Sequence, residues 1–212
     1  RGEGFELRTA GHGAIRARQG LLISTEGSER AQGPVKDLKQ AHARLTQARD
    51  RHESLAQLAG QHGAQDAGED QTAVSQTLEA QNEAVQGAGI VGKFPELSES
   101  HLVLASAAGM AAAAQGSVHL ASGEHAALTS GGHTSLSAGK RLLASAGGAI
   151  RLFAHKAGIR LFAAKGPVQV QAQDDQIELL ARKAATLIST HDWIRMKARK
   201  GISLQVPGST LL

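Results

Sequence analysis

The stretch VHLASGEHAALTSGGHTSLSAG (residues 118–139) repeats a short pattern with a period of eight residues. Apolar or small residues recur two positions apart, as at Val118 and Leu120, and a small residue such as Ser122 follows two positions later. Alternate residues of an extended chain face the same side, so this spacing predicts short β-strands. The next position holds glycine, which permits sharp bends, in four successive units: Gly123, Gly131, Gly139 and Gly147.

The same pattern continues over most of the chain. Thirteen units follow one another in steps of eight or nine residues, with their paired positions at 102/104, 110/112, 118/120, 126/128, 134/136, 142/144, 150/152, 159/161, 168/170, 177/179, 185/187, 194/196 and 202/204. A weaker beat of eight precedes them at Leu7, Ile15 and Ile23. A helix does not explain these units, because glycine and serine are frequent and the apolar spacing is two rather than three or four.

A helical pattern interrupts the repeat. Pro34 is suited to a first helical turn, and a heptad follows it at Leu38, Ala41, Leu45, Ala48, His52, Leu55 and Ala59. After a polar break over residues 60–70, a second helix is predicted from Val74, Leu78, Gln81 and Val85, ending at Gly87, Gly89 and Gly92. Two amphipathic helices joined by a short loop indicate an αα-hairpin. The predicted segments are therefore 1–33 (first β-repeat), 34–92 (inserted helical hairpin) and 93–212 (β-prism needle).

The repeat can close in two ways. Three successive units could form one coil of a single-chain solenoid, or three chains could wind together around one narrow core. The small third position favours three chains, because corners meeting near one axis leave room only for Ala or Ser, and intertwining removes exposed strand edges. We therefore predict a mainly β fold: an intertwined homotrimeric triple-stranded β-helix, or β-prism, built from repeats of eight to nine residues and carrying the inserted hairpin. Its predicted trimer core comprises Val118, Leu120, Leu128, Leu136, Ile150, Leu152, Ala154, Ile159, Leu161, Val168, Val170, Ile177, Leu179, Ala181, Leu187, Ile194, Met196, Ile202 and Leu204.

Composition excludes several kinds of chemistry. Only 2% of the residues are aromatic, so large rings cannot dominate a core. With no cysteine there is no disulfide, thiolate metal site or cysteine nucleophile. Neither a Gly-x-Ser-x-Gly elbow nor a phosphate-binding loop occurs, and no apolar run is long enough to span a bilayer. We predict that the chain is not an enzyme, binds no cofactor and, because it lacks an initiating Met and a signal peptide, is a fragment of a longer protein.

Charge is unevenly distributed within the net +4. Residues 140–200 hold twelve Lys or Arg against four acids, whereas residues 34–86 hold five against eight. Few aromatic residues accompany the basic ones, which argues against nucleic acid as a partner. The basic end has two interpretations: a charged outer face that keeps the needle soluble, or a docking surface for an acidic partner protein. The second interpretation gives the candidate cargo contacts Trp193, Arg195, Arg199 and Lys200, since an aromatic beside arginine is a common hot spot.

Histidines and paired acids offer no convincing site. His125 and His133 lie one repeat apart, and Arg141 continues their row, so in a trimer they would form solvated ladders on the outside rather than a metal site. Asp174 and Asp175 fall where the period stretches to nine, which is typical of a polar turn. We predict no metal site and no catalytic residue.

Five stretches resemble one known family. They are RGEGFELRT (1–9), GLLISTE (20–26), HLASGEH (119–125), TSGGHTS (129–135) and IRLFAHKAG (150–158). These motifs are similar to those of the C-terminal extension of VgrG proteins, the spikes of bacterial type VI secretion systems. The resemblance covers essentially the whole chain, including a helical insertion at this place.

The resemblance implies a function and several partners. It implies a structural spike that is assembled in the bacterial cytoplasm, punctures target membranes when injected into a target cell or the medium, and carries effectors. Implied partners are two further copies of the chain, a secreted effector or adaptor, a conical tip protein, and the rest of the spike and the tail tube. The alternative is a cargo-binding module, in which the hairpin or the basic end recognises one effector. An adhesin or polysaccharide-degrading solenoid would need a groove lined with aromatics or carboxylates, which the sequence does not offer.

Overall fold

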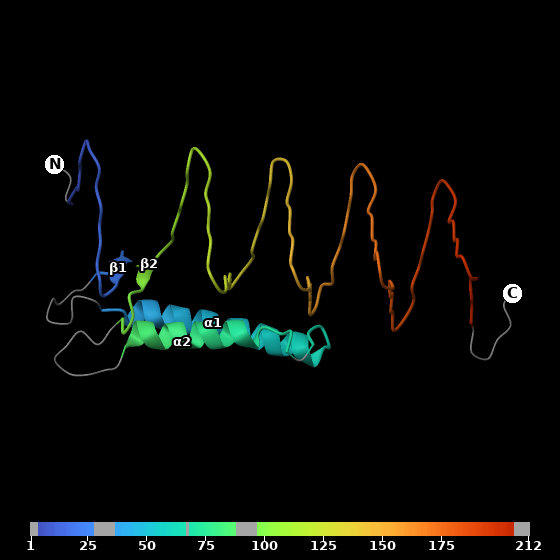
Figure 1. The fold of residues 1–212 in the computed structure, drawn as a ribbon, viewed down its shortest axis with the longest axis horizontal. Helices are drawn as coiled ribbons and strands as arrows, with labels where there is room; N and C mark the ends of the chain where they lie inside the picture. The colour runs from blue at the N-terminus through green and yellow to red at the C-terminus, as the bar shows by residue number, and fades with distance from the viewer. Residues whose placement is uncertain (1–3, 28–36, 67, 88–96, 206–212) are drawn as a thin grey trace. The chain divides into compact units, whose positions relative to one another are not determined.

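Among the described residues, regular secondary structure lies in the first half of the chain (Figure 1). The computed structural model describes residues 4–27, 37–66, 68–87 and 97–205 and divides into two units, Arg1–Ile159 and Arg160–Leu212. The elements follow in the order β1 (Leu21–Ser24), α1 (Lys39–Gln61), α2 (Thr72–Gln86) and β2 (Leu102–Ala105). All four belong to the first unit.

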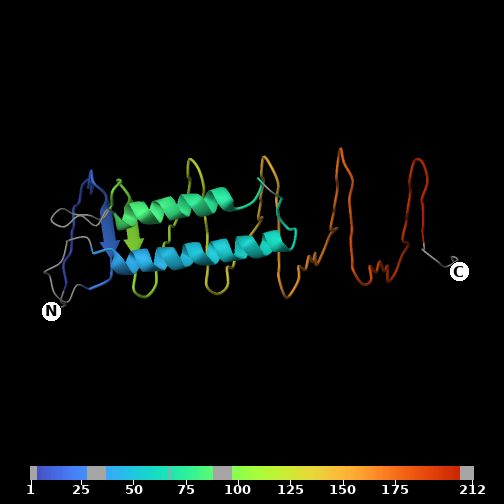
Figure 2. The same cartoon turned by 90° about the horizontal axis from the view of Figure 1, so that it is seen from below.

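Helices α1 and α2 pack side by side as an αα-hairpin (Figures 1 and 2). The predicted apolar stripes are buried only in part: Ala41 and Ala59 are buried on α1 and Val85 on α2, whereas Leu45 and Leu55 of the α1 stripe are exposed. Gly87 ends α2 with a φ of 73°, a left-handed conformation that suits glycine at a helix end. The predicted pair of helices is confirmed; Pro34, Gly89 and Gly92, which were expected to bound it, lie outside the described residues.

An aspartate just before each helix accepts a hydrogen bond from a backbone amide at the start of that helix. Asp37 Oδ1 accepts a hydrogen bond from the Lys39 amide at 3.2 Å, and Asp70 Oδ1 accepts one from the Thr72 amide at 2.9 Å. The first amides of a helix have no intrahelical partner, so these bonds stabilise the starts of α1 and α2. The bond from the Thr72 backbone, followed by that from its hydroxyl, lowers the pKa of Asp70 below its ordinary value.

The helical hairpin is inserted between two strands that pair with each other. Strands β1 and β2 are parallel, with Leu21 opposite Leu102, and the Leu21 amide donates to the His101 carbonyl at 2.9 Å. Gly20 precedes β1 with a φ of +97°, and a Cβ there would lie 2.7 Å from Leu97 Cδ1 and 2.9 Å from the His101 carbonyl oxygen. Glycine is therefore required where the returning chain crosses the start of β1.

A small core joins the base of the hairpin to these strands. It consists of Leu38, Ala41, Val85, Leu97 and Val103. Leu97 has a φ of 59°, which is unusual for a residue with a bulky side chain. Its amide donates to the Val85 carbonyl at 3.2 Å, and its buried side chain fills the core. Burial of this leucine offsets the backbone strain and fixes where the chain re-enters the repeat.

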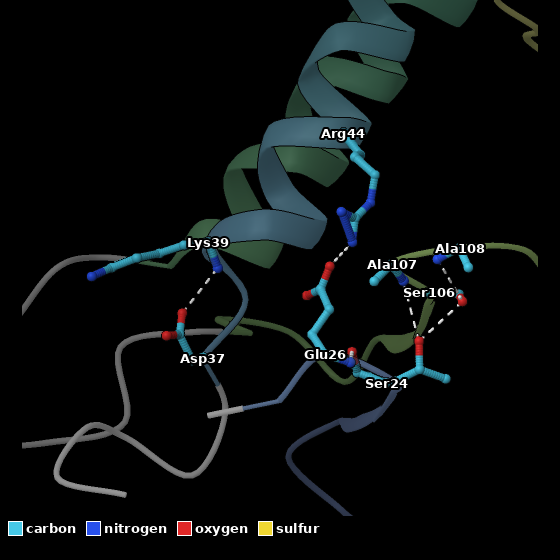
Figure 3. A network of polar contacts seen from close by, with 9 residues as sticks. Ser24, Glu26, Asp37, Lys39, Arg44, Ser106, Ala107 and Ala108 are labelled. Atoms are coloured by element: carbon cyan, nitrogen blue, oxygen red, sulfur yellow. Dashed lines mark hydrogen bonds and ion pairs between the residues drawn. The ribbon is translucent and has the colours of Figure 1, made fainter. Parts of the chain in front are cut away.

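Polar contacts also join the segments that follow β1 and β2, and one of them reaches α1 (Figure 3). Arg44 of α1 forms an ion pair with Glu26, whose side chain is only 11% exposed. Thr25 Oγ1 shares a hydrogen bond with Ser106 Oγ at 3.0 Å and accepts one from the Ala107 amide at 3.1 Å. The chain segments that follow β1 and β2 are thus held to each other, and the first of them is held to α1.

The repeat itself forms extended passes separated by bends, as predicted. In the first unit the bends begin at residues 107, 115, 123, 131, 139, 147 and 155, a step of eight. In the second unit they begin at 164, 173, 182, 190 and 199, in steps of eight or nine. The predicted glycine corners at Gly123, Gly131, Gly139 and Gly147 each open a bend. The predicted period is therefore confirmed through the described part of the repeat.

The structure of one chain has two helices and little sheet, so by itself it does not show the predicted mainly β trimeric prism. Among the described residues, only β1 and β2 form a strand ladder, and no backbone hydrogen bond joins residues 108–205 to another pass. A strand needs a neighbour to satisfy its amides and carbonyls, and successive passes of this chain do not supply one. The same observation argues against the single-chain solenoid, in which consecutive coils of one chain would pair.

Candidate assembly surface

The predicted trimer core is uncovered in the single chain. Its large side chains range in exposure from 48% at Ile194 to 91% at Leu120, and Ala154 and Ala181 are also exposed. Burying one Val, Leu, Ile or Met side chain contributes about 1.5–3 kcal/mol, so a soluble protein rarely leaves such a row open. The structure of one chain places these residues along the repeat but does not bring them together into a core.

Open grooves lie between the hairpin and the passes of the first unit. One groove of about 310 Å³ runs between α1 and β2, where Leu45, Leu104 and Met110 contribute its apolar wall. A second of about 600 Å³ lies between Leu55, Ala59 and the pass that contains Leu152 and Phe153. Side chains of one chain do not fill these grooves, as expected where other polypeptide segments belong.

The hairpin also contacts the repeat directly, through residues that sequence reasoning did not select. Arg151 Nη2 lies 2.8 Å from Asp66 Oδ2 and 2.6 Å from Glu69 Oε2, and its Nη1 donates to the Glu69 carbonyl at 3.1 Å. The hydrogen bonds that Arg151 donates to Glu69 and then to Asp66 raise the pKa of Arg151. The loop between α1 and α2 is thereby fastened to the pass that carries Arg151.

Aromatic rings reinforce this contact. The imidazole of His62, at the end of α1, stacks on Phe153 with ring centroids 5.7 Å apart, and His155 lies 5.3 Å from His62. Arg151 and Phe153 lie two positions apart, at the outward positions of one repeat unit. A bulky aromatic residue at an outward position was the sequence feature that could have indicated this contact. The sequence offered no reason to pair that strand with residues 62–69, because the pairing depends on the length of the hairpin.

The candidate cargo contacts lie in the second unit. Trp193 is 78% exposed, and its amide donates to its neighbour Asp192 at 2.8 Å, so the indole emerges from the bend at 190–192. Arg195, Arg199 and Lys200 are exposed, and within the described residues none of them forms an ion pair. The structure leaves this basic, aromatic surface accessible and does not show what it binds.

No metal centre or membrane span emerges from the described residues. In that part of the chain no three His, Asp or Glu side chains lie close enough to hold a metal ion. Asp174 and Asp175 occupy a bend, and Asp175 Oδ1 accepts a hydrogen bond from the Gln176 amide at 2.8 Å, as a turn residue does. Neither α1 nor α2 is long and apolar enough to cross a bilayer.

Two protein-family models match the chain. Residues 90–212 match "Uncharacterized protein conserved in bacteria (DUF2345)", and residues 1–59 match "Putative type VI secretion system Rhs element Vgr". The type VI secretion system spike proteins VgrG2b and VgrG2a of Pseudomonas aeruginosa are each 35% identical to it over 87% of its length. The chain belongs to the VgrG family of type VI secretion spikes. It spans 18% and 22% of these two relatives, which is about a fifth of their length.

Solved VgrG structures share its fold. "The VgrG spike from the Type 6 secretion system" aligns over 93% of this chain and 70% of the other, with a TM-score of 0.80 and 29% identity. "Structure of the Tle1 effector bound to the VgrG spike from the Type 6 secretion system" aligns over 93% and 57%, with a TM-score of 0.79 and 29% identity. The predicted family, the VgrG spikes of type VI secretion systems, is confirmed by these matches.

Proposed function

We propose that this VgrG chain is a needle segment of a type VI spike in which three copies intertwine around one core. The observation that carries the proposal is the row of large apolar side chains along the repeat, uncovered in a single chain. Three intertwined chains would bury that row on all sides. They would also supply the missing strand partners, because each pass would pair with passes of the other two chains.

The needle serves a mechanical role in this proposal. A closed β-prism has no free lateral edges and is held by backbone hydrogen bonds along its length, so it resists bending and unfolding when pushed against a membrane. The spike is assembled in the cytoplasm and injected, with a conical protein at its tip and the tail tube behind it. Support for the setting comes from the VgrG relatives, which are named as components of the secretion spike.

Carriage of an effector is the second part of the proposal. A related spike has been solved with the Tle1 effector bound to it. In this chain the exposed Trp193, Arg195, Arg199 and Lys200 offer an accessible surface of the kind that binds an acidic protein. The alternative, a module in which the hairpin recognises one cargo, can be tested by deleting residues 34–92: loss of one effector favours the module, and loss of all cargo favours the stalk.

The length of the particle tests the intertwined needle. If three chains interleave, each unit advances its chain by one strand spacing of about 4.8 Å, so thirteen units would span roughly 60 Å. A single-chain solenoid with three units per coil would give a stub of roughly 20 Å. Light scattering should show three chains per particle, and small-angle scattering should show the longer body. A monomeric mass or a compact stub would overturn the proposal.

A further inference from the structure

One five-residue motif occurs twice in direct succession. Residues 150–154 and residues 159–163 both read Ile-Arg-Leu-Phe-Ala. Each copy forms an extended pass, and each is followed by a three-residue bend, at 155–157 and at 164–166. A glycine with positive φ follows directly after the first bend (Gly158, 78°) and ends the second (Gly166, 87°). The two copies therefore share their sequence and an extended backbone followed by a bend.

The hairpin loop occupies the first copy. Arg151 pairs with Asp66 and Glu69, and Phe153 stacks on His62, as described above. This contact leaves the Phe153 side chain 37% exposed. The first copy thus shows what the motif binds: a helix end that presents a ring, followed by a loop that presents carboxylates.

The second copy is open. Phe162 is 87% exposed, and Arg160 is exposed and forms no ion pair within the described residues. An exposed phenylalanine beside an unpaired arginine has the composition of an interface hot spot. The first copy shows that this arginine and phenylalanine, two positions apart on one strand, can be engaged together.

Counting excludes the hairpin loops of further copies as the occupant. Every chain brings one hairpin loop and two motifs, and the loop is committed to the motif at Arg151 and Phe153. However many copies assemble, their hairpin loops therefore cannot fill the second motif. We propose that Arg160 and Phe162 form a docking site for a different polypeptide, a carried protein that presents an acidic loop at the end of a helix. That the occupant is a carried protein rests on the proposed spike function. The contacts expected at Arg160 and Phe162 do not depend on that function.

A peptide with the sequence of residues 55–72 is the probe, because it contains His62, Asp66 and Glu69. Titrated as a fluorescent peptide against the full chain, it should bind with one site per chain. It does not displace the chain's own loop, because a tethered loop has an effective concentration in the range of mM. Arg160→Glu or Phe162→Ala should weaken binding at least tenfold, and a peptide carrying Lys in place of the two acids should bind the Arg160→Glu variant.

A double variant makes the negative result informative. Asp66→Ala with Glu69→Ala frees the first motif, so the same peptide should then bind at two sites per chain. Binding at one site in this variant and at none in the unchanged chain would show a competent probe and a second motif that does not dock, which overturns the proposal. Binding at neither motif would overturn it as well, because the ion pair and ring stack would then be too weak to form a docking site.

A matched control variant tests whether the peptide recognises the motif or binds any exposed apolar side chain. Ile188 is an exposed outward residue at the equivalent position of a later unit, but Thr186 stands where the motif has arginine. Ile188→Ala should leave peptide affinity unchanged, and an equal loss would show an unspecific apolar surface instead. If Phe162→Ala raises hydrogen exchange at residues 62–69, one loop bridges both motifs and the counting argument is wrong. Light scattering on the same samples reports trimer formation independently, so failure of docking is distinguishable from failure of the spike proposal.

Discussion

The hairpin junction is the region where the base of the hairpin packs on β1 and β2. It differs from the needle repeat in how apolar side chains are buried. At the junction, Leu38, Val85 and Leu97 are buried by other parts of the same chain, and β1 pairs with β2. Along the repeat, side chains of the same type, such as Leu120 and Leu179, are exposed, and the backbone has no strand partner in the described residues. One region carries its own core, and in the proposed trimer the other would contribute one third of a shared core.

Breaking the shared core should have the largest effect. Ala154→Leu or Ala181→Leu enlarges a position predicted to meet its two symmetry copies near the axis. Each added side chain is expected to cost about 1–3 kcal/mol, three times over in a trimer. Light scattering should show loss of the trimer or its dissociation on dilution.

The control for this experiment is the same substitution on the outward side. Ala111 lies between the two inward positions of its unit and is exposed. Ala111→Leu should leave the trimer mass and its thermal stability nearly unchanged. A stable Ala154→Leu trimer would show that Ala154 does not face the axis, and that the small third position is not what selects three chains.

The isolated hairpin tests whether the junction is self-sufficient. A peptide of residues 34–86 lacks Leu97 and Val103, which supply part of the core at its base, and helices in proteins draw most of their stability from such tertiary packing. We expect circular dichroism to show a mostly unfolded peptide. Extending it to residue 106 and adding residues 18–26 in trans should raise the helix content; a strongly helical peptide without them would instead reveal an independent domain and favour the cargo-module alternative.

Sequence reasoning succeeded where the pattern is local. The period of two within strands and of eight between glycines such as Gly123 and Gly131 predicted the bends, because both depend on the backbone preferences of neighbouring residues. The heptad from Leu38 to Ala59 predicted α1 for the same reason. What it could not supply were contacts between distant segments, such as Arg151 with Glu69 or Gly20 with Leu97, because they depend on the length and direction of the hairpin.

The close approach at Gly20 gives a more local test of the junction. Gly20→Ala places a Cβ 2.7 Å from Leu97 Cδ1 at a φ of +97°, so both sterics and backbone strain oppose it. A destabilisation of about 1–3 kcal/mol is expected, seen as faster hydrogen exchange over residues 97–105. Gly109→Ala is the control, because nothing lies within 4 Å of its added Cβ. Unchanged exchange in Gly20→Ala would show that β1 and Leu97 do not meet in solution.

The smallest expected effect is the pH dependence of the start of α2. The pKa of Asp70 is lowered in the folded chain from its ordinary value of 3.8 by hydrogen bonds from Thr72. A lowered folded pKa means that the stabilising contribution is present above the unfolded value and is lost as the pH falls through the folded value. The melting temperature of the unchanged chain should therefore approach that of Asp70→Asn below pH 3.8 and exceed it slightly above that pH. Asparagine keeps an oxygen that can accept the Thr72 amide but has no charge, so the difference between the two proteins isolates the carboxylate. A pH-independent difference would show that Asp70 stabilises α2 through its shape rather than its ionisation.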